Sequence, residues 1–166
     1  MIENIVTVKL NVDEELTIKK NTLRGVNAEN GKRIAIVTGI HGDELEGQYI
    51  CYQLVKKITA NMANLTGTIE IYPAVNPLGM ESVSRAFPMT GLDMNRVFPG
   101  SNIGSISENI AKKLVEDIKG ADMCVDIHSS NIFIREIPQV RVRPENADYL
   151  IKYAKLLNTD MVDRKS

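Results

Sequence analysis

The alternation of apolar and polar side chains near the start of the chain predicts a pair of β-strands. Between residues 4 and 20, apolar residues recur at alternate positions, first at Val6 and Val8 and, after a turn-like stretch, at Leu16 and Ile18. A period of two is typical of strands with one buried face. We therefore expect an antiparallel pair at the edge of a sheet.

The remaining periodicity predicts strands that alternate with helices. Strands are expected at 33–39, 68–72, 121–127, 132–134 and 139–142, and helices at 43–60, 105–119 and 146–157. Asp43 is the expected N-cap of the first helix, with Glu46 completing a capping box, and Ser105 with Glu108 predicts the same cap for the second. This order implies an α/β fold, a three-layer sandwich around a mixed, mainly parallel β-sheet.

The length of the chain suits one domain. Its 166 residues are enough for a single hydrophobic core. We expect a catalytic-type α/β domain over residues 1–166, with an edge β-hairpin at 1–30 and the core that carries the candidate site at 33–129. A further strand begins near Met161 and is not completed, so we expect the chain to be truncated after residue 162.

Composition and charge narrow the class of protein. Hydrophobic residues make up 43% and charged residues 25% of the chain, which is typical of globular proteins. Because 20 basic residues balance 21 acidic ones, we expect no nucleic-acid or membrane partner. We also expect neither a membrane span nor a secretory signal, and therefore a cytoplasmic protein. Cys51 and Cys124 are then expected to be buried, reduced thiols.

The two histidines of the chain both follow predicted strands. His41 comes after the first buried run, with Glu44 three positions further on, and His128 comes after the run that ends at Ile127. Sites in open α/β sheets form at the carboxyl ends of strands. Two imidazoles and one carboxylate, with a fourth position open, are the ligand set of a catalytic zinc. The alternative is a turn with a surface histidine and a capping acid, beside a histidine that merely ends a strand.

Other polar residues near these histidines have two interpretations each. Asp126 either orients an imidazole or lines the site, or it is a hydrogen-bonded core carboxylate. The segment from 73 to 103 is a long loop without clear periodicity, and such loops are usually functional. Its Arg85 and Arg96, with Asn95 as a directed amide, are suited to binding a carboxylate. The alternative is that both arginines are solvated.

Four short motifs occur together in the order of a known family. They are His41-Gly42-x-Glu44, Asn76-Pro77-x-Gly79 with Arg85, Asp93-x-Asn95-Arg96-x-Phe98, and Asp126-x-His128. Over about residues 33–129 this combination resembles the succinylglutamate desuccinylase and aspartoacylase family, which is similar to the zinc carboxypeptidases. The resemblance implies a zinc carboxypeptidase-like fold and one Zn²⁺ per chain, held by His41, Glu44 and His128.

The resemblance also implies an activity. Arg85 would be the catalytic residue that polarises the scissile carbonyl, and Asn95 with Arg96 would bind a carboxylate of a small-molecule substrate. The implied reaction is hydrolysis of the amide bond of a small N-acyl amino acid by a metal-activated water, which would make the protein a zinc-dependent deacylase. A carboxypeptidase-like peptidase is the alternative within the enzymes.

One part of the family pattern is missing. Members of the family use a glutamate as general base downstream of the last zinc histidine, and only Glu136 and Glu145 follow His128 here. Neither stands in a matching context, so no base is assigned, although a base typically contributes about 10²–10⁴-fold. A catalytically silent metal-binding fragment is therefore a further alternative. A chain without its C-terminal part would expose apolar surface, so a homo-oligomer is also compatible with the sequence.

Overall fold

The fold is given by a computed structural model that describes residues 1–130 and 133–164. The chain divides into two compact units, Met1–Ile132 and Phe133–Ser166, and each has a sheet of its own. The two units are described separately below. A single domain over the whole chain stays a prediction.

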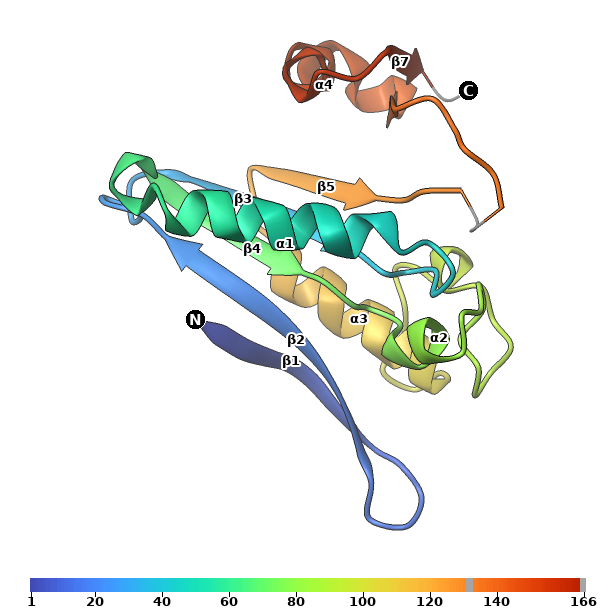
Figure 1. The fold of residues 1–166 in the computed structure, drawn as a ribbon. Helices are drawn as coiled ribbons and strands as arrows, with labels where there is room; N and C mark the ends of the chain where they lie inside the picture. The colour runs from blue at the N-terminus through green and yellow to red at the C-terminus, as the bar shows by residue number, and fades with distance from the viewer. Residues whose placement is uncertain (131–132, 165–166) are drawn as a thin grey trace. The chain divides into compact units, whose positions relative to one another are not determined.

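The first unit is built on a mixed sheet of five strands. They are β1 (Ile2–Lys9), β2 (Glu15–Arg24), β3 (Lys32–Thr38), β4 (Gly67–Tyr72) and β5 (Met123–Ile127). Their order across the sheet is β1-β2-β4-β3-β5 (Figure 1). The pairs β1–β2 and β2–β4 are antiparallel, whereas β3 pairs in parallel with both β4 and β5. The antiparallel edge pair and the mixed sheet are confirmed, but the pairings divide evenly instead of being mainly parallel.

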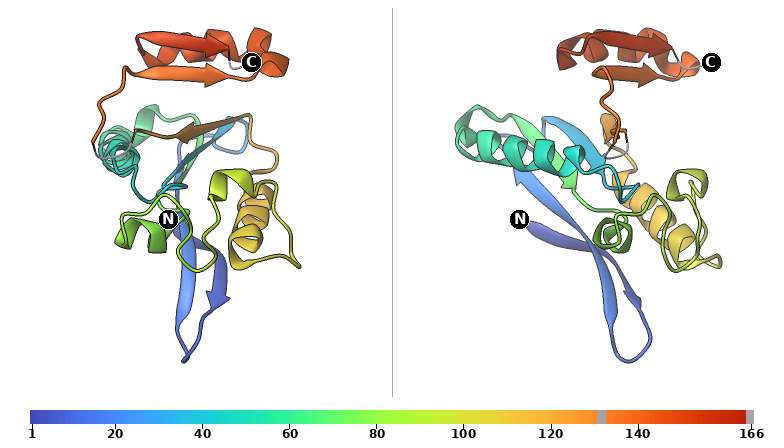
Figure 2. Two further views of the ribbon diagram at one scale, coloured as in Figure 1. Left: turned by 90° about the vertical axis from the view of Figure 1, so that its right-hand side faces the viewer. Right: turned by 45° about the vertical axis from the view of Figure 1, so that its right-hand side comes forward.

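Two helices cover the opposite faces of this sheet. Figures 1 and 2 show α1 (Glu46–Thr59) on one side of the strands and α3 (Ile106–Ile118) on the other. Ile36 packs in the cluster beneath α1, whereas its neighbour Val37 packs in the cluster beneath α3. Successive side chains of a strand point to opposite faces, so β3 is buried on both sides. The predicted three-layer sandwich is therefore confirmed.

The start of α1 differs from the prediction. The helix begins at Glu46 with Leu45 as its N-cap, and no side chain caps it. Asp43 is not the cap: within residues 1–130 and 133–164, its buried Oδ1 atom has no hydrogen-bond partner. Glu44 consequently lies in a loop instead of in the first helical turn. By contrast, Ser105 and Glu108 form the predicted capping box at the start of α3.

The long loop after β4 contains more structure than its sequence suggests. It includes a short helix, α2 (Pro77–Glu81), and a 3₁₀ turn, η2 (Met94–Arg96). A further 3₁₀ turn, η1 (Met62–Asn64), precedes β4. Both cysteines are free thiols, but only Cys51 is buried. The prediction that Cys124 is buried is wrong, because alternate residues of the edge strand β5 face outward.

The second unit is a small parallel pair of strands with a helix between them. Its strands are β6 (Gln139–Val142) and β7 (Met161–Arg164), and its helical elements are η3 (Pro144–Asn146), α4 (Ala147–Ala154) and η4 (Lys155–Leu157). The strand at 139–142 and the helix near 146–157 are confirmed. Of the strand predicted at 132–134, Ile132 lies outside the described residues and the other two are not in a strand. Among the described helices, none is long and apolar enough to cross a membrane.

A buried group of charges fastens α3 to the sheet. Lys20 on β2 donates to Oε1 of Glu70 at 3.0 Å and to Oδ2 of Asp117 on α3 at 2.8 Å. Arg33 donates through Nε to the other oxygen of Glu70 at 2.8 Å, and the Tyr72 hydroxyl donates to Asp117 at 2.7 Å. Each buried charge thus has an oppositely charged partner, as burial of ions requires.

Removal of the central carboxylate from this group is expected to destabilise the fold. We expect Glu70→Gln to lower the free energy of unfolding by about 3 kcal/mol, the lower end of the range for breaking a buried ion pair, because Lys20 keeps Asp117. Urea unfolding of the variant measures the change. Lys113→Ala removes an exposed pair with Glu116 and is the control, expected to resemble wild type. Equal midpoints for the two variants would contradict the prediction.

Candidate metal centre

The two histidines lie at one edge of the main sheet. His41 follows β3 after a turn at Gly39, whose φ of 71° is one that glycine adopts without strain. His128 directly follows β5, which pairs in parallel with β3, so the two strands end side by side. The turn buries His41, whose side chain is 2% exposed, whereas that of His128 is 31% exposed. The site therefore opens on the His128 side.

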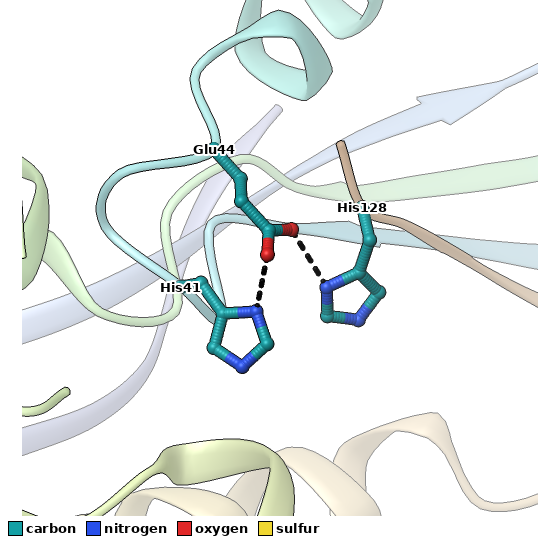
Figure 3. A group of neighbouring side chains, drawn as sticks. All are labelled: His41, Glu44 and His128. Atoms are coloured by element: carbon teal, nitrogen blue, oxygen red, sulfur yellow. Dashed lines mark hydrogen bonds and ion pairs between the residues drawn. The ribbon is translucent and has the colours of Figure 1, made fainter. Parts of the chain in front are cut away.

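Glu44 lies between the two imidazoles. Its Oε1 atom is 2.6 Å from Nδ1 of His41, and its Oε2 atom is 2.9 Å from Nδ1 of His128 (Figure 3). One ligand atom from each of the three residues lies within 4.8 Å of the others. A divalent cation could therefore be held by two ring nitrogens and a carboxylate oxygen, the donor set of a three-ligand zinc site.

Two further carboxylates contact the imidazoles on the side away from Glu44. Oδ1 of Asp93 is 2.9 Å from Nε2 of His41, and Oδ2 of Asp126 is 2.8 Å from Nε2 of His128. With Nε2 occupied in both rings, Nδ1 is the atom left to bind a metal. Ligating histidines commonly have such a carboxylate on the other nitrogen. Of the two interpretations of Asp126, this contact fits an orienting carboxylate.

The charges of the site favour a cation. Burial alone would raise the pKa of Glu44, but hydrogen bonds with His128, His41 and the Ser129 amide outweigh it and hold that pKa far below its usual range. Hydrogen bonds to Asp126 and then Glu44 raise the pKa of His128 to about 10. Three carboxylates (Glu44, Asp93 and Asp126) surround the imidazoles, and only one guanidinium, that of Arg85, lies beside them. A cation at Nδ1 of His128 would take the place of the proton that these carboxylates stabilise there.

Arg85 reaches this group from the long loop. Its guanidinium donates to Oε1 of Glu44 at 3.3 Å and to Oδ2 of Asp93 at 3.2 Å. Asn95 and Arg96 belong to η2, and both are exposed. Among the described residues, neither side chain is hydrogen-bonded to His41, Glu44 or His128. The structure thus brings Arg85 to Glu44, one of the three candidate ligands, and leaves Asn95 and Arg96 at the surface near Asp93.

Sequence reasoning assigned no role to two residues of the site. Asp93 was part of a motif, but its side chain proves to contact His41 and Arg85 and to accept from the backbone amide of Asn95 at 2.9 Å. An aspartate two residues before the Asn-Arg pair is a recognisable turn signal. Ser129 donates its backbone amide to Oε2 of Glu44 at 3.0 Å. No sequence signal identifies a backbone donor of this kind.

The chain matches one family model and resembles solved structures of the same family. Residues 30–163 match the succinylglutamate desuccinylase/aspartoacylase catalytic domain. An N-alpha-acetyl-L-2,4-diaminobutyric acid deacetylase from Halomonas elongata is 31% identical over 114 residues, which cover 68% of this chain and 33% of the relative. A crystal structure of an aspartoacylase family protein from Mesorhizobium loti is 27% identical with a TM-score of 0.80, covering 98% of this chain and 52% of that one.

The fold is also that of a metallo-carboxypeptidase. A crystal structure of such an enzyme from Burkholderia cenocepacia has a TM-score of 0.72 and 19% identity, covering 100% of this chain and 48% of that one. The chain therefore spans about a third of the length of the deacetylase and about half of each solved structure. These likenesses confirm the predicted fold class and the family resemblance.

The outer carboxylates provide a test of the metal centre. We expect Asp93→Asn and Asp126→Asn each to weaken zinc affinity by about 10–100-fold, because a neutral amide orients and polarises an imidazole less well than a carboxylate. Equilibrium competition with a chromogenic chelator measures the affinity. The exposed Asp160→Asn in the second unit makes the same chemical change and is the control. Wild-type affinity in both site variants would show that these carboxylates do not support a metal.

Proposed function

Because the chain belongs to the succinylglutamate desuccinylase/aspartoacylase family, we propose that it is a zinc-dependent hydrolase that cleaves the amide bond of a small N-acyl amino acid. The observation that carries the proposal is the convergence of His41, Glu44 and His128 on one point. The same convergence supports their assignment as the zinc ligands, with one ion per chain. When bound, zinc activates water for attack and acts as a Lewis acid on the carbonyl.

The residues around the ligands have distinct proposed roles. Arg85, held at the edge of the metal group by Glu44 and Asp93, polarises the scissile carbonyl and stabilises the charge that develops on its oxygen. Asn95 and Arg96 bind a carboxylate of the substrate. Their exposure supports this assignment, because an amide and a guanidinium at the surface can donate hydrogen bonds to a planar anion that arrives from solvent.

The class of substrate is proposed from the relative and from the charges. The deacetylase from Halomonas elongata is named for an acetylated amino acid. A substrate of that class has an amide for the metal and Arg85, and a carboxylate for Arg96. We therefore propose that the substrate is an N-acyl amino acid rather than a peptide. A cytoplasmic location and self-association stay predictions.

A catalytically silent metal-binding protein is the second candidate. Within residues 1–130, Glu44, Asp93 and Asp126 all contact an imidazole, so none of these three carboxylates is available as a general base. Glu136 and Glu145 belong to the second unit. This candidate predicts zinc binding without turnover.

Zinc content and turnover together separate these candidates. Protein purified without chelator is measured for bound metal and then assayed against N-acetyl amino acids and against short peptides. Turnover of the acyl amino acids with one equivalent of zinc supports the deacylase. Turnover of peptides alone supports a carboxypeptidase-like peptidase, and bound zinc without turnover supports the silent protein.

Loss of a ligand should remove the metal. We expect His128→Ala to bind zinc at least 100-fold more weakly than wild type, because only one imidazole and one carboxylate remain. Elemental analysis and chelator competition measure the loss, and near-ultraviolet circular dichroism monitors the fold. One equivalent of tightly bound zinc in the variant would refute the proposed ligand set.

Loss of Arg85 should affect catalysis without affecting metal binding. We expect Arg85→Ala to lower kcat by about 10²–10³-fold, the effect of removing one donor to a developing oxyanion, while zinc content stays at wild-type level. Arg141→Ala in the second unit is the control. Unchanged kcat would remove Arg85 from the proposed mechanism, and lost zinc would indicate a structural role instead.

A further inference from the structure

Both polar atoms of the Asn76 side chain are hydrogen-bonded to backbone groups. It is fully buried at the start of α2 and belongs to the Asn-Pro-x-Gly motif. Its Oδ1 atom accepts a hydrogen bond from the Gly79 amide at 2.9 Å, which caps the helix. Its Nδ2 atom donates to the carbonyl of Ala86 at 3.2 Å and to that of Ile40 at 3.4 Å.

The two carbonyls come from the loops that carry the site. Ile40 directly precedes His41, and Ala86 directly follows Arg85. One amide nitrogen therefore bridges the turn that presents a metal ligand and the loop that presents the guanidinium. The orientation of the amide is defined, because its reversal would place an oxygen against two carbonyl oxygens and a nitrogen against an N–H group.

Backbone contacts around Asn76 bring the same two loops together. The Gly42 amide donates to the carbonyl of Ser84 at 3.0 Å, and the Ser84 amide donates to that of Gly79 at 2.8 Å. A Cβ atom at Gly42 would overlap the backbone of Gly79, and one at Gly79 would overlap the Asn76 amide. The loops thus pack backbone against backbone, and the Asn76 amide adds a buried side-chain link between their carbonyls.

Capping alone does not account for this residue. An N-cap needs only a side-chain oxygen, and Ser, Thr or Asp provides one as well as Asn does. The Nδ2 donors add nothing to α2, whereas a buried donor left without an acceptor costs free energy. The amide nitrogen therefore favours the one arrangement of the two loops in which both of its acceptors are within reach.

We propose that Asn76 is a positioning residue, which sets the place of Arg85 relative to His41 by bridging the carbonyls of Ile40 and Ala86. The proposal rests on the role proposed for Arg85 above. A displacement of about 1 Å in a group that acts on the substrate can cost about 10²-fold in rate. Asn76 thus acts on the reaction through Arg85 and not through the substrate.

The position of Arg85 can be observed without turnover. In ¹⁵N-labelled protein, the Nε–H resonance of Arg85 is assigned by its disappearance in Arg85→Lys. Asn76→Asp keeps the oxygen that caps α2 and removes the Nδ2 donors, so it is the principal variant, and Asn76→Ala is the second. We expect both to shift the Arg85 resonance. Asn61→Ala, which removes an exposed asparagine that donates to the carbonyl of Lys57, should leave it unchanged.

A wild-type Arg85 resonance in a folded Asn76→Asp variant would overturn the proposal. A role in packing alone predicts that result, with a lower melting temperature and nothing more. If Asn76→Ala does not fold, Asn76→Asp still decides, because it retains the cap of α2. Zinc content of the variants is measured alongside and is expected to stay near one equivalent, since the ligands themselves are intact.

Measurement of turnover provides a second, independent test of the role of Asn76. We expect Asn76→Asp to lower kcat by about 10–100-fold with KM changed less than threefold, and to have no further effect in the Arg85→Ala background. Additive losses would show that Asn76 does not act through Arg85. If the wild-type protein hydrolyses no amide, the proposed function fails, and the Arg85 resonance still decides the role of Asn76.

Discussion

The candidate site depends on one carboxylate that joins two strands. Glu44 contacts His41, which follows β3, and His128, which follows β5, at 2.6 and 2.9 Å. Those strands are parallel neighbours, so the two imidazoles leave the sheet at the same edge. Residues 87 positions apart in the chain, His41 and His128, meet only because of this pairing. Any change in the β3–β5 register would separate the ligands.

The rest of the first unit keeps this pairing rigid. β3 begins at the buried charges around Glu70, where Arg33 also donates to carbonyls at the end of α3, and it ends at the turn that leads to His41. Between them, helices cover both faces of the strand. A strand buried on both sides and fixed at its amino end has little freedom to move, so the loops at its carboxyl end are presented from a stable base.

The meeting of His41, Glu44 and His128 was easier to predict from the sequence than the contacts around them. His41 and His128 follow apolar runs whose strand character is unambiguous, and strand ends of a parallel sheet converge. The predicted start of α1 was too early, because Asp43 and Glu46 have the spacing of a capping box. Glu44 instead lies in a loop, where it contacts the distant His128. The exposure of Cys124 depends on which face of β5 points outward, and the contacts of Asp93 depend on how its loop packs. Local periodicity determines neither of these.

The site combines two levels of order that suit different tasks. His41 and Glu44 are buried, and each makes more than one hydrogen bond, so they would need little rearrangement to hold an ion. Arg85 pairs with Glu44 and Asp93 while its own side chain is 52% exposed. An ion pair exposed to this extent is worth about 0–1 kcal/mol, so the role proposed for Arg85 would require its guanidinium to leave Glu44 only at small cost. The backbone on either side of Arg85 is hydrogen-bonded, at Ser84 to Gly42 and Gly79 and at Ala86 to Asn76, so only the Arg85 side chain would have to move.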